Sequence, residues 1–230
     1  MRLSSSPYDA IFRELAPTIP LAFVRRLAYE ESRLNHLSDD GGAKGLLQIT
    51  PIVVDDYQAA RGLQSGVRIE KLTRGYRWLD YSGLLEPRLN VAMADFTFSQ
   101  IKRSYSRHPW GAAAWDDPRW VSLFVNGWNA GYSNGGGVGR AASRIEARGE
   151  VVTVDSVRAE ALRSPGVIVE KLSTERAANW AKLVTRRYFE DLGAPSAASS
   201  PSSRSSPSSS KTSLALALLA GGALLVSELA

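Results

Sequence analysis

Residues 20–36 read PLAFVRRLAYEESRLNH, and this stretch decides the fold. Its proline suits the first turn of a helix, where a backbone N–H is not needed. Apolar side chains then recur at the spacing of one helical face, at Val24, Leu27, Ala28 and Leu34. This spacing predicts an amphipathic helix whose apolar face is turned toward the core of a helical protein.

Helical spacing of the same kind recurs along residues 7–193. The segments that show it are 8–16, 20–36, 89–104, 119–127 and 174–192. The best strand candidate is EVVTVDSV at residues 150–157, and the sequence shows no alternation of strands with helices and no internal repeat. We therefore expect a mainly α domain over residues 1–193.

The composition changes abruptly after this domain. Residues 195–213 contain 11 Ser and 3 Pro, which predicts a flexible linker over residues 194–213. Residues 214–227 begin with the apolar run LALALLAGGALLV. The uncharged stretch around this run is short for a membrane span, which needs about 17–25 apolar residues. We expect it to attach the protein to a membrane, and the alternative is a core helix that returns to the domain.

Composition excludes several classes of site. The chain has no Cys and two His, which excludes disulfides, thiolate zinc sites, iron–sulfur clusters and a Cys nucleophile. We expect no metal and no cofactor. The formal charge of +5 suits an anionic partner, but no nucleic-acid recognition motif accompanies it, so nucleic acid is not an expected partner. The first residues lack the apolar run of a secretory signal, so export by a cleaved signal is not expected.

Two adjacent glutamates lie on opposite faces of the predicted helix. Glu31 falls on the apolar stripe, whereas Glu30 lies with Arg26 and Arg33 on the polar face, which we expect to be solvated. A carboxyl held against apolar side chains has its charged form disfavoured, so its pKa rises and it suits general acid catalysis. The alternative for Glu31 is a residue at the rim of the stripe that pairs with an Arg or caps a later helix.

A glycine-rich turn follows this helix. We expect Asn35 to end the helix and residues 39–51, DDGGAKGLLQITP, to turn the chain before a second helix that begins at 46–49. Tight backbone beside a buried acid indicates the wall of a cleft.

Four motifs in a fixed order resemble one enzyme family. They are ESRLN at 31–35, GAKGLLQITP at 42–51, EPRLNV at 86–91 and GWNAG at 127–131. They are similar to the E-S-x-x-N, G-A-x-G-L-M-Q, D-P-x-x-N-I and A-Y-N-A-G signatures of the soluble lytic transglycosylase and goose-type lysozyme family. Leu47 and Trp128 stand where the family usually has Met and Tyr. The long spacing between the second and fourth motifs predicts inserted loops in 55–85 or 103–118.

The resemblance implies a lysozyme-like helical fold with a groove for the glycan strands of peptidoglycan. It also implies cleavage of the bond between N-acetylmuramic acid and N-acetylglucosamine, with a 1,6-anhydro product and one glutamate as acid and then base. The implied role of Glu31 is that of acid and base, and Ser32 would orient it. Gln48 and the backbone of Gly45 and Leu46 would line the cleft. Trp128 and Asn129 would contact the substrate. Asn90 is expected to give structural support.

Other functions stay open at this point. Asp39 and Asp40 are possible second carboxylates, which would make the protein an inverting lysozyme-type hydrolase, although turn chemistry favours exposed loop residues. A wall-binding structural protein without turnover is a further alternative. The expected setting is a virion that opens the cell wall during genome entry, with other virion or envelope-complex proteins as partners.

Overall fold

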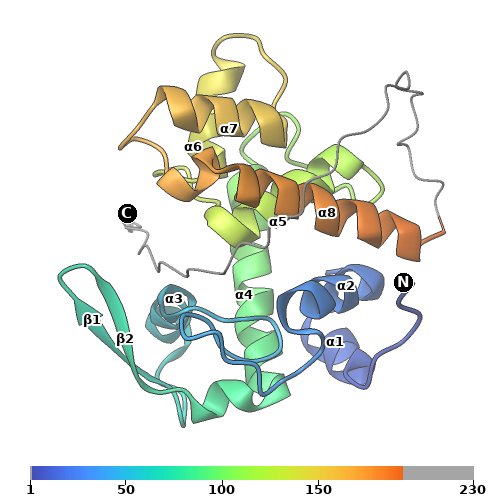
Figure 1. Ribbon diagram of the computed structural model, residues 1–230, viewed down its shortest axis with the longest axis vertical. Coiled ribbons are helices and arrows are strands. Elements are labelled where there is room, and N and C mark those ends of the chain that lie inside the picture. Colours follow the sequence, from blue (N-terminus) through green and yellow to red (C-terminus); the bar gives the residue numbers. More distant parts are fainter. Residues whose placement is uncertain (1, 194–230) are drawn as a thin grey trace, which may run out of the picture.

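The computed structural model describes residues 2–193, and these are mainly helical, as expected (Figure 1). The predicted linker at 194–213 and the apolar segment at 214–227 lie outside the described residues. Within residues 2–193, no helix is both long enough and apolar enough to cross a membrane.

The helices and strands follow one another as α1 (Asp9–Leu15), α2 (Leu21–Ser32), α3 (Pro51–Arg61), β1 (Arg68–Leu72), β2 (Gly75–Asp80), η1 (Ser82–Leu85), α4 (Pro87–Tyr105), α5 (Pro118–Ala130), α6 (Val138–Glu146), α7 (Val154–Arg163), η2 (Glu170–Ser173) and α8 (Glu175–Asp191). The five segments with helical spacing are thus confirmed as helices. Helix α2 ends at Ser32, three residues before the expected end at Asn35.

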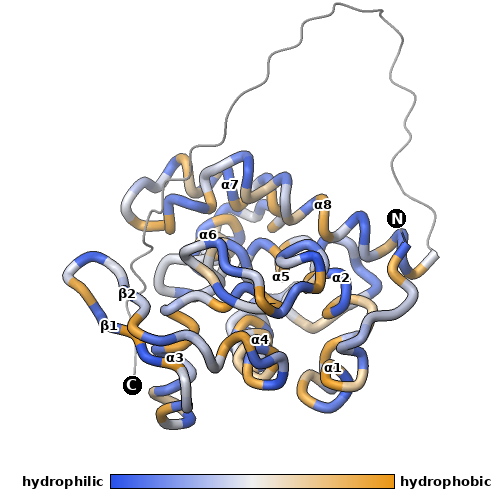
Figure 2. Tube along the Cα trace, turned by 60° about the horizontal axis from the view of Figure 1, so that its bottom comes forward, coloured by the Kyte–Doolittle hydropathy of each residue, from blue (hydrophilic) through white to orange (hydrophobic). Residues whose placement is uncertain are grey.

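Helix α4 lies between the other elements (Figure 1). In this view α1 and α2 lie to its right and α3 and the β hairpin lie to its left, while α5 to α8 lie around its upper end (Figure 1). Each helix alternates hydrophilic and hydrophobic residues along its length, as a helix with one buried face should (Figure 2). Phe23 of α2 meets Phe124 of α5 and Tyr188 of α8 edge to face, with ring centroids 5.5 Å apart in both pairs. These contacts join α2 to α5 and α8 in one core.

Strands β1 and β2 form an antiparallel hairpin, which is the sheet of the described residues. The hairpin falls inside residues 55–85, where the sequence predicts an insertion.

Two local predictions are wrong. Residues 150–157 form no strand, because the Thr153 side chain accepts a hydrogen bond from the Ser156 N–H and the Ser156 side chain accepts one from the Thr153 N–H. This capping box starts α7 at Val154, although the β-branched residues around it have high strand propensity. Residues 46–49 form a turn, and α3 begins at Pro51, because proline suits a first helical turn.

The prediction that Glu30 is solvated is also wrong, because α8 covers the polar face of α2. The Glu30 side chain is 3% exposed and accepts hydrogen bonds from Nη1 of Arg26 at 3.0 Å and from Nη1 of Arg187 at 2.7 Å. The Arg26 guanidinium also donates to both oxygens of Asp191 at 2.7 Å. The partners of Glu30 are thus ionic, as its helical spacing indicates, but the network is buried.

Candidate active site

Glu31 lies in the last turn of α2 and is partly exposed. Val24, Leu27 and Ala28, which share its face of the helix, are fully buried, so these three positions of the predicted stripe are confirmed, whereas Leu34 lies beyond the end of α2. The indole Nε1 of Trp128 donates a hydrogen bond to Glu31 Oε1 at 2.7 Å. The carboxyl is therefore anchored between the end of α2 and the end of α5.

Burial raises the pKa of Glu31 from the ordinary 4.5 to about 7. The Trp128 hydrogen bond and the positive charge of Lys171 act in the opposite direction and lower this pKa, whereas the negative charges of Asp40 and Glu30 raise it further. At neutral pH the carboxyl is therefore divided between its protonated and ionised forms, which is the state that a combined acid and base needs.

Strained backbone surrounds this carboxyl. Within residues 2–193, the non-glycine residues with positive φ are Arg33 at 59°, Leu34 at 61° and Gln48 at 47°. Two of them follow Glu31 by two and three positions, and the third belongs to the neighbouring loop. Non-glycine residues in this conformation each cost roughly 1–3 kcal/mol and concentrate at functional sites. Their position therefore agrees with a functional role for this end of α2.

Ser32 connects α2 to the loop rather than to the acid. Its hydroxyl lies 2.8 Å from the Leu46 carbonyl oxygen and 3.1 Å from the Ala28 carbonyl oxygen. The Leu46 side chain is fully buried, so only its backbone is left for the expected role in a cleft. Ser32 thus holds the loop against the helix that carries Glu31.

Asn90 of α4 holds the loop that follows α2 through three hydrogen bonds. Its Nδ2 donates to the carbonyl oxygens of Lys44 and Leu84, and its Oδ1 accepts from the Leu47 N–H at 2.8 Å. A Cβ at Gly45 would lie 2.2 Å from Asn90 Nδ2, and the φ of this glycine is +77°, so no other residue fits there. The geometry confirms the structural role expected for Asn90.

The remaining residues with an expected role are Gln48, Trp128 and Asn129. Gln48 is nearly buried, and its Nε2 donates to the Gly45 carbonyl oxygen at 2.8 Å, so it closes the loop. Trp128 packs on Phe98 with ring centroids 5.0 Å apart. Asn129 is partly exposed next to it, at the end of α5. The structure thus brings Trp128 into contact with Glu31, whereas the Gln48 side chain binds the backbone of its own loop.

The two loop aspartates differ in their partners. Asp39 forms an ion pair and a hydrogen bond with Lys44, and this contact lowers the pKa of Asp39. Asp40 accepts hydrogen bonds from the backbone N–H groups of Gly42 and Ala43, at 3.0 and 2.6 Å. Both are exposed turn residues, as turn chemistry predicts.

Sequence reasoning missed Lys171, whose charge acts on Glu31. It lies in η2, about 140 residues further along the chain. Desolvation lowers the pKa of Lys171, and the charges of Glu31 and Asp40 raise it in part. A lysine in a short 3-10 helix gives no signal in the sequence, because only the fold brings η2 to the end of α2.

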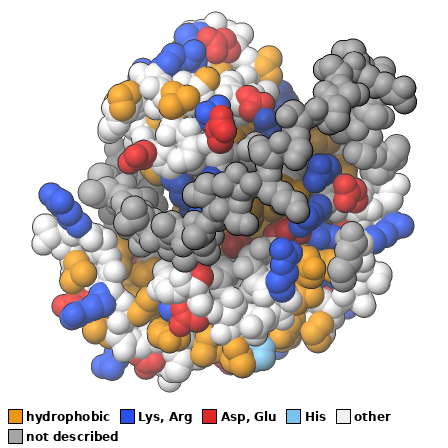
Figure 3. All heavy atoms as spheres, in the orientation of Figure 1, with side chains coloured by type: hydrophobic (Ala, Val, Ile, Leu, Met, Phe, Trp, Pro, Cys, Tyr) orange, Lys and Arg blue, Asp and Glu red, His pale blue; other side chains and the backbone are white. Residues whose placement is uncertain are grey.

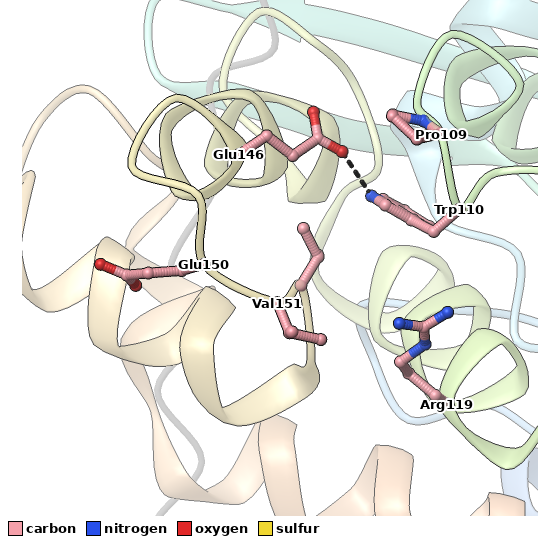
Figure 4. A pocket seen from close by; sticks show the side chains of 7 residues that line it. Pro109, Trp110, Arg119, Glu146, Glu150 and Val151 are labelled. Atoms are coloured by element: carbon pink, nitrogen blue, oxygen red, sulfur yellow. Dashed lines mark hydrogen bonds between the residues drawn. The ribbon is translucent and has the colours of Figure 1, made fainter.

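A cavity of about 300 Å³ lies elsewhere, between the start of α5 and the segment after α6 (Figure 4). Trp110 Nε1 donates to Glu146 Oε1 at 2.7 Å, and His108 Nδ1 lies 2.9 Å from Glu146 Oε2. Both carboxylate oxygens are therefore engaged within the protein, and we interpret this cluster as structural. In the described part of the chain, no group of three or more His, Cys, Asp or Glu side chains could hold a metal ion.

A comparison of this sequence with protein-family models finds none that matches it, and a comparison with curated proteins likewise finds no match.

Proposed function

We propose that the protein is a peptidoglycan lytic transglycosylase that cleaves the β-1,4 bond between N-acetylmuramic acid and N-acetylglucosamine. The observation that carries the proposal is Glu31, a partly exposed carboxyl that burial brings to a pKa of about 7 and that Trp128 holds in place. The substrate class comes from the resemblance of the motifs around Glu31, Gln48, Asn90 and Asn129. We propose that the glycan lies in a lysozyme-like groove between α2 and α5.

In the first step the protonated Glu31 donates its proton to the glycosidic oxygen while the bond from that oxygen to C1 of the muramic residue breaks. The N-acetylglucosamine residue leaves with a hydroxyl. In the second step the ionised Glu31 takes the proton from the C6 hydroxyl of the muramic residue, and O6 closes on C1. One group acts as acid and then as base, no water enters, and Glu31 ends protonated as it began.

The neighbours of Glu31 support this double role. The Trp128 indole donates to one carboxyl oxygen only, which leaves the other oxygen for the substrate. Because this hydrogen bond and Lys171 oppose the effect of burial, the pKa stays near neutrality. The strained turn and the Asn90 hydrogen bonds would hold the loop rigid beside the substrate.

A lysozyme-type hydrolase is the second candidate, and one observation favours it. The negative charge of Asp40 lies near enough to raise the pKa of Glu31, so Asp40 is the second carboxylate that could activate water in an inverting reaction. Asp39 is a weaker choice because it is paired with Lys44.

Digestion of purified peptidoglycan with the full chain, followed by mass spectrometry of the released fragments, tests the proposal. Fragments one water lighter than hydrolysis products support the transglycosylase, whereas hydrated ends that disappear in Asp40→Asn support the hydrolase. Glu31→Gln should release nothing. Glu175→Gln, the same change at an exposed helical position, is the matched control and should release wild-type products. Release by Glu31→Gln would refute the assigned acid, and no release by the wild type would favour a wall-binding protein.

Attachment to a membrane through residues 214–227 and a role in a virion during genome entry stay predictions.

A further inference from the structure

A second cavity, of about 350 Å³, is lined by four side chains, which are Arg26, Tyr29, Arg33 and Arg187. Three come from α2 or its C-cap and one from α8. Figure 3 shows Lys and Arg side chains gathered on the right of the visible face, where Figure 1 has α2 and α8. A cavity lined by three guanidinium groups is suited to an anion.

The negative charges of this cavity are buried, and two of its positive charges are exposed to solvent. The carboxylates that pair with the arginines are almost completely buried, with exposed fractions of 3% for Glu30 and 2% for Asp191. The side chains of Arg33 and Arg187 are 63% and 34% exposed. The three guanidinium groups outnumber the two carboxylates; Arg26 is buried at 1% exposed, and Arg33 and Arg187 are the ones that meet solvent. A ligand would therefore meet a positive surface.

The guanidinium groups are also held in place. Two of them contact the Tyr29 ring, whose centroid lies 5.4 Å from Arg26 Cζ and 4.7 Å from Arg33 Cζ. Arg187 donates to Glu30 through Nη1 alone, at 2.9 and 2.7 Å. Cation–π contacts and a fixed anchor reduce the conformational entropy that binding would otherwise lose.

The cavity is close to Glu31 along α2 but on a different side of it. Tyr29 and Arg33 are two residues before and after Glu31, so they lie within one helical turn of it. Helical spacing turns Tyr29 and Arg26 away from Glu31. A group that branches from the glycan, rather than the glycan itself, would therefore reach the cavity. An extended peptide of four residues spans about 13 Å, which exceeds the width of a helix.

We propose that this cavity binds a carboxylate of the peptide stem that the muramic residues of peptidoglycan carry. The inference rests on the proposed function for its substrate class. The planar fork of an arginine matches a carboxylate in a bidentate geometry, and the cavity offers two exposed forks side by side. The stem contact would select glycan strands that still carry peptides.

Binding is the test, measured with the full chain carrying Glu31→Gln so that no substrate is consumed. The probes are a disaccharide with a tetrapeptide stem and the same disaccharide without it. We expect the stem to strengthen binding about tenfold, and we expect Arg33→Gln with Arg187→Gln to remove this preference. A double variant with Arg33→Lys in place of Arg33→Gln keeps the positive charge without the planar fork, and it should recover part of the stem preference. Arg74→Gln, an exposed arginine of the hairpin, is the matched control and should keep the full preference.

Two results would overturn the inference. Equal binding of the two probes, or a preference that survives in the double variant while thermal unfolding shows that variant folded, would refute it. If the double variant loses binding to phosphatidylglycerol vesicles but keeps the stem preference, the cavity serves a membrane phosphate instead. A stem preference in a protein that releases no fragments from peptidoglycan would support the cavity and refute the proposed catalysis. Release of fragments without a stem preference would do the reverse.

Discussion

Replacing Glu31 by Gln should stabilise the fold in a pH-dependent way. A carboxyl with a raised pKa in the folded state favours folding less as the pH rises, because the unfolded chain ionises first. The rise from 4.5 to about 7 in the pKa of Glu31 corresponds to about 3 kcal/mol at about 1.4 kcal/mol for each tenfold change. Because the side chain is partly exposed, we expect about 2 kcal/mol.

The sign follows from the two protonation states. Below about pH 4.5 both the folded and unfolded chains carry the proton, so Glu31→Gln should match the wild type. Between about pH 4.5 and 7 the wild type loses stability relative to the variant. Above about pH 7 the difference is complete, and the variant should melt about 4–8 °C higher.

Thermal unfolding of both proteins, followed by circular dichroism at about pH 4 and about pH 8, measures this difference. Glu30→Gln is the informative comparison, because Glu30 is next to Glu31 but is buried in ion pairs with Arg26 and Arg187. It should destabilise the fold by about 3 kcal/mol. A Glu31→Gln variant that is no more stable than the wild type at about pH 8, or equally stabilised at both pH values, would refute the reasoning.

Trp128→Phe removes the indole donor that lowers the pKa of Glu31, so this pKa should rise and activity should persist to higher pH. An NMR titration of Glu31 that finds no change in its pKa would contradict this. Asn90→Ala removes three hydrogen bonds from a fully buried side chain and should cost about 3 kcal/mol in urea unfolding; a loss below about 1 kcal/mol would mean that the loop does not need it. Gly45→Ala should not fold, whereas Gly166→Ala, at the same φ of +77° but in open space, should fold and lose about 1 kcal/mol; equal soluble yields and melting temperatures would contradict the steric argument.

The sequence predicted those features that depend on local spacing. The apolar stripe that holds Glu31 follows from helical periodicity alone. The Asn90 support came from a resemblance of motifs, and the structure shows three hydrogen bonds that explain it. The hairpin at 68–80 fell inside a predicted insertion, but its strands were not predicted.

Features that depend on a distant element could not be predicted in this way. Glu30 was expected in solvent because nothing in residues 20–36 indicates that α8 covers them. The effect of Lys171 on Glu31 likewise requires the fold. The strand expected at 150–157 failed for a local reason, since Thr153 and Ser156 cap a helix more strongly than the surrounding valines favour a strand.

The contacts of Asp191 have a consequence for biosynthesis. This carboxylate lies at the end of α8, accepts hydrogen bonds from Arg26, and accepts another from the Leu3 N–H at 2.8 Å. The start of the described fold is thus completed by residues near its end, 188 positions further along the chain. A nascent chain that lacks α8 would leave Arg26 without Asp191 and Glu30 without Arg187, so the fold cannot be finished during translation of the shorter chain. Chains cut short before residue 191 should therefore be removed by proteases.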